Sequence, residues 1–197
     1  MARVIYLNGT SSAGKSSIAR ALQERLHELY LYVQLDVFLQ MVPPHGWDRA
    51  GGMVITPLPD HGLQLDFGPL CQSLFSAFHR SLGALASAGN QPIVDDVLLE
   101  RRWLRDAVEA LAEHEVCFVG VHCPVDVAEA RERERTDRAQ GIARGQYDLV
   151  HAHRLYDVQV DTSVLTPQGC AERILEAQQH LGTPTAFERL RDAVDGV

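Results

Sequence analysis

Short apolar runs alternate with longer amphipathic stretches along most of the chain. Buried strands are predicted at five mostly apolar runs: residues 3–9, 32–36, 91–97, 115–122 and 156–162. Between these runs apolar residues recur every three or four positions, which predicts helices at 14–30, 67–88, 99–114 and 167–181. Further helices are expected to open at Pro124 and at Pro184. This order predicts a three-layer α/β fold with a five-stranded parallel sheet and helices on both faces.

The segment 40–64 departs from this pattern because it is rich in proline and glycine. It predicts a long irregular loop, and such loops often carry function. Within it Trp47 is the best candidate to line a pocket. The chain contains neither an internal repeat nor a linker composition, so we expect a single domain over residues 1–197. A short helix over about 184–195 looks like an addition to the repeating pattern.

Composition and charge exclude several classes of protein. The 197 residues are 46% hydrophobic and 22% charged, which is enough apolar material for a core. No apolar run reaches membrane-spanning length, and the start of the chain lacks the pattern of a signal peptide, so a cytoplasmic protein without membrane contact is expected. The formal net charge of −8 disfavours general nucleic-acid binding. Four cysteines without paired spacing predict reduced, buried thiols rather than a zinc site.

The sharpest local signal is G-T-S-S-A-G-K-S at residues 9–16, which matches G-x-x-x-x-G-K-[ST] in full. It lies after the first predicted strand and opens the first helix, where such a loop wraps phosphates. Lys15, the only lysine of the sequence, is expected to reach the β- and γ-phosphates, and the Ser16 hydroxyl is expected to bind Mg²⁺. The motif predicts ATP and Mg²⁺ as cofactors, with nucleotide contacts from Gly9, Thr10, Ser11, Ser12, Ala13, Gly14, Lys15, Ser16 and Ser17.

Two aspartates, Asp95 and Asp96, end the third predicted strand. The carboxyl ends of parallel strands line the ligand crevice, so one of these carboxylates is expected to help Ser16 hold the metal. The sequence does not distinguish between them. The alternative is that the acid only caps the helix that follows.

An arginine-rich segment lies between the fourth and fifth strands, and we interpret about 127–146 as a mobile lid. Arg131, Arg135 and Arg138 have the spacing of one helical face and are expected to contact the nucleotide. Arg133 and Arg144 are better explained as solvent-exposed arginines in salt bridges, with acids such as Glu132 as partners. Gly141 and Gly145 are expected to give the lid hinge freedom. The alternative for the whole segment is a solvated helix.

The acceptor side of the site is predicted around Asp36, at the end of the second strand. A carboxylate there can accept the proton of an attacking hydroxyl. The loop that follows, about 37–66, is expected to form the acceptor pocket. The alternative is that Asp36 caps the turn after the strand.

Five blocks in order resemble the chloramphenicol phosphotransferase-like family of small P-loop kinases. The blocks are LNGTSSAGKSSIARALQ, the LD at 35–36, IVDDV, FVGVHC followed by RE…R.DR..G, and VH…YDVQVDTS. The resemblance covers about residues 1–180 and implies strand order 2-3-1-4-5, ATP–Mg²⁺ as donor, and phosphorylation of a small-molecule hydroxyl, as in chloramphenicol. It implies a catalytic set of Asp36, Lys15, Arg135 and Arg138, with Asp36 as base, phosphate contacts from Arg135 and Arg138, and stacking of Arg131 on adenine.

Two alternative functions stay open beside the small-molecule O-kinase. A kinase of a sugar nucleotide would need basic residues around 40–66, where Arg49 is the single one. A nucleotide-binding switch protein would need no acceptor base. The expected partner is therefore a small, largely uncharged hydroxyl acceptor, and a homo-oligomer is compatible with the sequence.

Overall fold

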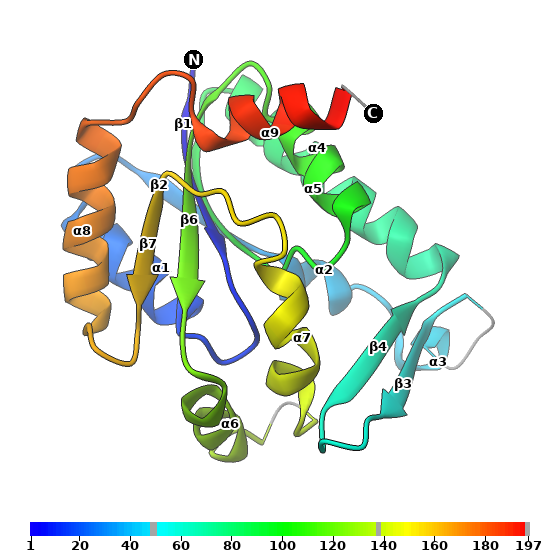
Figure 1. Cartoon of the computed structure of the whole chain (residues 1–197). Helices are drawn as coiled ribbons and strands as arrows, with labels where there is room; N and C mark the ends of the chain where they lie inside the picture. Colours follow the sequence, from blue (N-terminus) through cyan, green and yellow to red (C-terminus); the bar gives the residue numbers. More distant parts are fainter. Residues whose placement is uncertain (48–50, 137–138, 196–197) are drawn as a thin grey trace.

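A five-stranded parallel sheet forms the centre of the computed structural model, which describes residues 1–47, 51–136 and 139–195 (Figure 1). Its strands are β1 (Arg3–Asn8), β2 (Tyr30–Gln34), β5 (Gln91–Asp96), β6 (Glu115–His122) and β7 (Val158–Asp161). They lie in the order β2-β5-β1-β6-β7, and each neighbouring pair is parallel. The labels skip β3 and β4, which form a separate sheet. Counted within the large sheet alone, the order reads 2-3-1-4-5.

Helices cover both faces of the sheet, so the predicted fold class is confirmed. One face packs against α1 (Lys15–Arg25) and α8 (Pro167–Gln179). The other packs against α4 (Pro69–Ser87), α5 (Arg101–Ala110) and α9 (Ala186–Asp195). The remaining helices are shorter: α2 (Leu35–Leu39), α3 (Pro44–Trp47), α6 (Val125–Arg133) and α7 (Ile142–Val150).

The strand side chains divide the core into two clusters, one on each face of the sheet. On β1 and β5, Ile5 and Ile93 face α1, whereas Tyr6 and Val94 face α4. This alternation follows from the two-residue repeat of a strand. The four cysteines are buried and unpaired, as predicted. Within the described residues no helix is long and apolar enough to cross a membrane.

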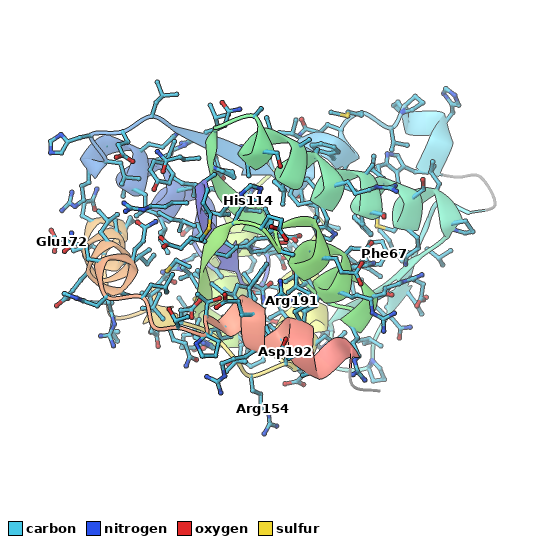
Figure 2. The ribbon with its side chains drawn as sticks, turned by 90° about the horizontal axis from the view of Figure 1, so that it is seen from above. Phe67, His114, Arg154, Glu172, Arg191 and Asp192 are labelled. Atoms are coloured by element: carbon cyan, nitrogen blue, oxygen red, sulfur yellow. The ribbon has the colours of Figure 1, made fainter. Side chains whose placement is uncertain are left out.

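The prediction of an irregular loop over 40–64 was wrong. This segment contains α3 and an antiparallel hairpin of β3 (Met53–Pro57) and β4 (Leu63–Phe67), with Ile55 opposite Leu65. Its prolines and glycines mark the ends of these short elements rather than the absence of structure, because Pro57 ends β3 and Gly62 accepts the Leu58 N–H in the turn. Seen from above, Phe67 on β4 and Glu172 on α8 lie at opposite ends of the molecule (Figure 2).

Candidate active site

The G-x-x-x-x-G-K-S motif forms the turn between β1 and α1, where the sequence predicts it. A Cβ at Gly9 would lie 2.4 Å from the carbonyl oxygen of Val121, so only glycine fits against β6 there. Gly14 is the N-cap of α1 with φ +96°, a left-handed conformation that favours glycine. The loop therefore folds over the N-terminus of α1, whose backbone N–H groups and dipole favour a bound phosphate.

Lys15 and Ser12 give this loop its polar interior. The Lys15 ammonium is buried and donates to the carbonyl oxygens of Gly9 and Thr10, both at 2.8 Å. Ser12 also has a left-handed backbone, and its buried hydroxyl has no hydrogen-bond partner among the described residues. Buried polar groups normally have partners, so a loop with an unsatisfied hydroxyl and a folded-back ammonium fits an anionic ligand.

Asp95 lies beside the loop on the α1 face of β5. Its Oδ2 accepts a hydrogen bond from the Ser16 hydroxyl at 3.0 Å, and its Oδ1 is 3.6 Å from Nζ of Lys15. The side chain is largely but not fully buried. A hydroxyl, a carboxylate and an ammonium therefore meet at one point of the sheet edge.

Asp96 is not brought to Ser16, although both aspartates were metal candidates. Its carboxylate points to the opposite face, where it is fully buried, accepts the Tyr6 hydroxyl and lies 3.0 Å from Nε2 of His79. Burial alone would raise the pKa of Asp96, but the hydrogen bonds and charge that face it, above all from His79, hold the pKa below its usual value. The physical reason for the divergence is the strand repeat, which sends consecutive side chains to opposite faces.

Asp36 lies at the same edge but not at a strand end. β2 ends at Gln34, and Asp36 is in the first turn of α2. The helix begins here because Leu35, Phe38 and Leu39 have helical spacing and pack on the core that faces α4. The side chain of Asp36 nevertheless lines the cleft that contains Lys15 and Asp95.

Arg131, in the last turn of α6, is bound to the edge of the phosphate loop. Its guanidinium donates to the hydroxyl of Thr162 at 2.9 Å and to the Thr162 carbonyl at 2.8 Å. The Thr162 hydroxyl in turn donates to the Ala13 carbonyl at 2.8 Å. Thr162 therefore links Arg131 to the phosphate loop by hydrogen bonds.

The predicted single helical face for Arg131, Arg135 and Arg138 was wrong. α6 ends at Arg133, so Arg135 follows the helix. The backbone N–H of Arg135 donates to the carbonyl oxygen of Glu132 in the turn that ends the helix. Arg135 still lines the cleft with Arg131. Arg138 lies outside the described residues. Arg133 is exposed, as expected for an arginine without a site role.

Glu132 does not belong to a solvated salt bridge. Its carboxylate is buried and accepts the backbone N–H groups of Gly141 at 2.6 Å and Ala143 at 3.0 Å. These are N–H groups at the start of α7 that have no partner within the helix. Glu132 therefore joins α6 to α7. Arg144, by contrast, forms the expected salt bridge, with Glu129, although both side chains are partly buried rather than exposed.

Gly141 and Gly145 contact the hairpin rather than provide free hinges. The Gly141 carbonyl accepts the Leu63 N–H at 2.8 Å. A Cβ at Gly145 would lie 1.9 Å from the Leu63 carbonyl oxygen. These glycines let the backbone of α7 touch the backbone of β4, so the hairpin and α7 form one packed unit.

The candidate site is one cleft of about 260 Å³. Its lining residues are Ser12, Gly14, Lys15, Ser16, Ser17, Leu35, Asp36, Asp95, Val97, Arg131 and Arg135. Within the described part of 37–66 no residue lines this cleft, and Trp47 packs against the core instead. Trp47 therefore does not line this cleft, and its expected place in an acceptor pocket stays a prediction.

Two contacts of the site were not predicted from the sequence. The Ser11 N–H donates to Oε1 of Gln146 on α7 at 2.8 Å, and the Tyr32 hydroxyl donates to Oδ2 of Asp95 at 2.8 Å. Gln146 is 135 positions from Ser11, so no local pattern could reveal it. The alternation along β2 does place Tyr32 on one face with Tyr30, but not beside Asp95.

The chain is similar to known proteins in sequence and in fold. A family model described as chloramphenicol phosphotransferase-like protein matches residues 2–179. Two relatives from two strains of Mycobacterium tuberculosis, both named "Putative O-phosphotransferase", are 33% identical, with 96% of this chain and 88% of each relative covered.

Solved structures show a similar fold. A sugar kinase from Janibacter sp. superposes with a TM-score of 0.63 at 18% identity, covering 91% of this chain and 95% of that one. The APS kinase of Mycobacterium tuberculosis, solved with AMPPNP and APS, gives a TM-score of 0.63 at 14% identity, covering 90% and 98%.

Proposed function

This chain belongs to the chloramphenicol phosphotransferase-like family of small P-loop kinases and is an ATP-dependent small-molecule kinase, and from this premise we propose that it phosphorylates a hydroxyl group of a small, largely uncharged molecule. One observation carries the proposal. Asp36 lines the same cleft as Lys15, Ser16 and Asp95, so a candidate base for an acceptor and the residues suited to a donor phosphate face a common space.

The phosphate loop fits the triphosphate of ATP. Gly9 lets the loop pack against β6, Gly14 lets it turn into α1, and the Ser12 hydroxyl and Lys15 ammonium supply donors. Arg131 and Arg135 add positive charge across the cleft. Charge that spreads over the transferring phosphoryl group is stabilised by such fixed cations.

Ser16 and Asp95 also have the chemistry of a Mg²⁺ site. In kinases this ion is held by one or two protein oxygens together with substrate phosphates, so a large cluster of acids is not needed. Ser16 and Asp95 are hard oxygen donors 3.0 Å apart, and they would hold the ion. When bound, Mg²⁺ would screen the negative charge of the β- and γ-phosphates.

Asp36 is proposed as the acceptor-side base. It would accept the proton of the acceptor hydroxyl as that oxygen forms its bond to the γ-phosphorus. The bond between the γ-phosphorus and the bridging oxygen breaks, and ADP leaves with that oxygen. Lys15 would stay beside the phosphates throughout, neutralising charge in the transition state.

An uncharged acceptor is favoured by the scarcity of cations outside the donor side. Lys15, Arg131 and Arg135 are accounted for by the triphosphate, and Arg49 is the single basic residue between 40 and 66. Arg49 lies outside the described residues. Leu35 and Val97 contribute apolar surface to the cleft. Chloramphenicol is one such alcohol to test.

The test is a phosphotransfer assay with ATP, Mg²⁺ and a panel of hydroxylated molecules that includes chloramphenicol, sugars and a sugar nucleotide. We expect ADP release that depends on an uncharged acceptor, with a product heavier by one phosphoryl group in mass spectrometry. The proposal would be overturned by exclusive phosphorylation of the sugar nucleotide. ATP binding without acceptor-dependent turnover across the panel would also count against it and would favour a switch protein.

A further inference from the structure

Tyr32 lies beside the proposed metal site but outside the set of residues assigned to it so far. It is on β2, with Gln34 of the same strand paired in register with Asp95 of β5. The ring is half-buried against the core that faces α1, and its hydroxyl donates to Oδ2 of Asp95 at 2.8 Å. The phenol therefore reaches a carboxylate of the site from a neighbouring strand.

The two oxygens of Asp95 have different surroundings. Oδ2 accepts two hydroxyl donors, Tyr32 at 2.8 Å and Ser16 at 3.0 Å, whereas Oδ1 faces Nζ of Lys15 at 3.6 Å. A carboxylate with one donor can still rotate about its terminal torsion, and a second donor on a rigid strand restricts this rotation. The Ser16 hydroxyl, with its proton directed to Oδ2, keeps its lone pairs available for a cation.

We propose that Tyr32 is a positioning residue for the metal: it holds the Asp95 carboxylate, and through it the Ser16 hydroxyl, in the orientation that receives Mg²⁺. This inference rests on the proposed function, because the ion arrives with the nucleotide. Partners that orient metal-binding groups in this way commonly change metal affinity when they are removed.

The protonation state of the phenol supports a constant role. Burial, followed by the charge of Asp95, raises the pKa of Tyr32 well above its usual value. A tyrosine hydroxyl is protonated at neutral pH even without this shift, so the donor role rests on the geometry. Since Tyr32 also packs against the core, its hydroxyl and its ring have to be tested separately.

Tyr32→Phe removes the hydroxyl and keeps the ring. Tyr30→Phe is the matched control, since Tyr30 lies on the same strand and face and its hydroxyl accepts from Gln178 instead of binding a site carboxylate. The first measurement is the affinity for the fluorescent nucleotide mant-ADP in EDTA. The second is the affinity of the protein–ADP complex for Mn²⁺, followed by loss of the free-ion EPR signal.

We expect Tyr32→Phe to weaken Mn²⁺ binding by roughly 10-fold or more, while the affinity for mant-ADP in EDTA and the urea midpoint stay at wild-type values. Tyr30→Phe should match the wild type in the metal and nucleotide titrations. In an Asp95→Asn background, Tyr32→Phe should cause no further loss, because the phenol acts through that carboxylate.

Unchanged Mn²⁺ affinity in Tyr32→Phe overturns the inference and leaves the proposed function intact. Equal losses in EDTA and with Mn²⁺ also overturn it, since they would indicate a structural role. Failure of the wild-type protein to bind mant-ADP under either condition overturns the proposed function, and this inference with it.

Discussion

Asp95 and Asp96 are consecutive residues whose carboxylates lie on opposite sides of the sheet, one against Ser16 and the other against His79. This separation turns two similar acids into a site residue and a core residue. Asp95 is partly open to the cleft, whereas Asp96 is 1% exposed. The two positions should therefore respond differently to the same substitution.

Asp96→Asn should destabilise the fold by about 1–3 kcal/mol, because a buried acceptor network with Tyr6 and His79 is replaced by an imperfect one. Asp95→Asn should leave the free energy of unfolding close to wild type and weaken Mg²⁺-dependent nucleotide binding. Urea unfolding and nucleotide titration of both variants check this pair. The reverse pattern would mean that Asp96 is the metal-side residue.

Lys15→Ala should lower kcat by roughly 100-fold or more, because a fixed cation beside the transferring phosphoryl group is lost. Arg173→Ala, on the exposed side of α8, removes the same charge far from the cleft and should leave kcat unchanged. Steady-state phosphotransfer kinetics measure both. Near wild-type turnover by Lys15→Ala would contradict the assignment of the phosphate loop.

Asp36→Asn keeps the size of the side chain but cannot take a proton at neutral pH. We expect phosphotransfer to fall by roughly 10²–10⁴-fold, the usual contribution of a general base. ATP affinity should change by no more than about twofold, since an acceptor-side base adds little to donor binding. A collapse of ATP affinity with intact turnover per bound nucleotide would assign Asp36 to the donor side instead.

Arg135→Ala and Arg133→Ala compare two arginines on either side of the end of α6. Arg135 lines the cleft and Arg133 is exposed, so the first change should depress kcat and the second should be nearly silent. The same loss of kcat is expected for Arg138→Ala. Kinetics and thermal unfolding of the variants distinguish transition-state contact from helix stability. Equal losses at Arg133 and Arg135 would indicate a structural effect.

His151 should make the protein sensitive to mild acid. Burial, followed by the neighbouring His122, His153 and Lys15, lowers the pKa of His151 from 6.5 to about 3. Between these values the unfolded chain binds a proton that the folded chain does not, so the free energy of unfolding should fall as the pH drops from about 6.5 toward 3.

His151→Gln should reduce the slope of this part of the stability curve, measured by urea unfolding at several pH values. The remaining slope is expected from His153, whose pKa burial lowers from 6.5 to about 4. His27→Gln, at an exposed position, is the control and should keep the wild-type slope. The explanation fails when His151→Gln shows the same dependence on pH as the wild type.

The phosphate loop could be predicted from the sequence because its requirements are local. Gly9, Gly14 and Lys15 act within one turn between a strand and a helix, and the spacing alone specifies that turn. The choice between Asp95 and Asp96 is different in kind. Strand alternation shows that they diverge, but His79 and Tyr6, which identify the buried one, lie 17 and 90 positions away.

The hairpin and the end of α6 escaped prediction for a related reason. Residues 53–57 are short and largely exposed and end at Pro57, whereas residues 63–67 alternate as L-Q-L-D-F, a five-residue strand pattern that the surrounding prolines and glycines obscure. At Arg133 the charged sequence continues with helical composition, while the chain turns because the buried Glu132 binds the start of α7. Both outcomes depend on contacts between segments rather than on local preference.

The contact between Gly145 and Leu63 has a consequence for protein engineering. Since any Cβ at position 145 would meet the Leu63 carbonyl at 1.9 Å, residues 53–67 cannot be exchanged for a hairpin of different depth while α7 is kept. Chimeras that exchange the hairpin should therefore transplant 53–67 and 141–150 together as a single unit. If only the hairpin is randomised, we expect that variants whose backbone no longer fits against Gly145 will not fold.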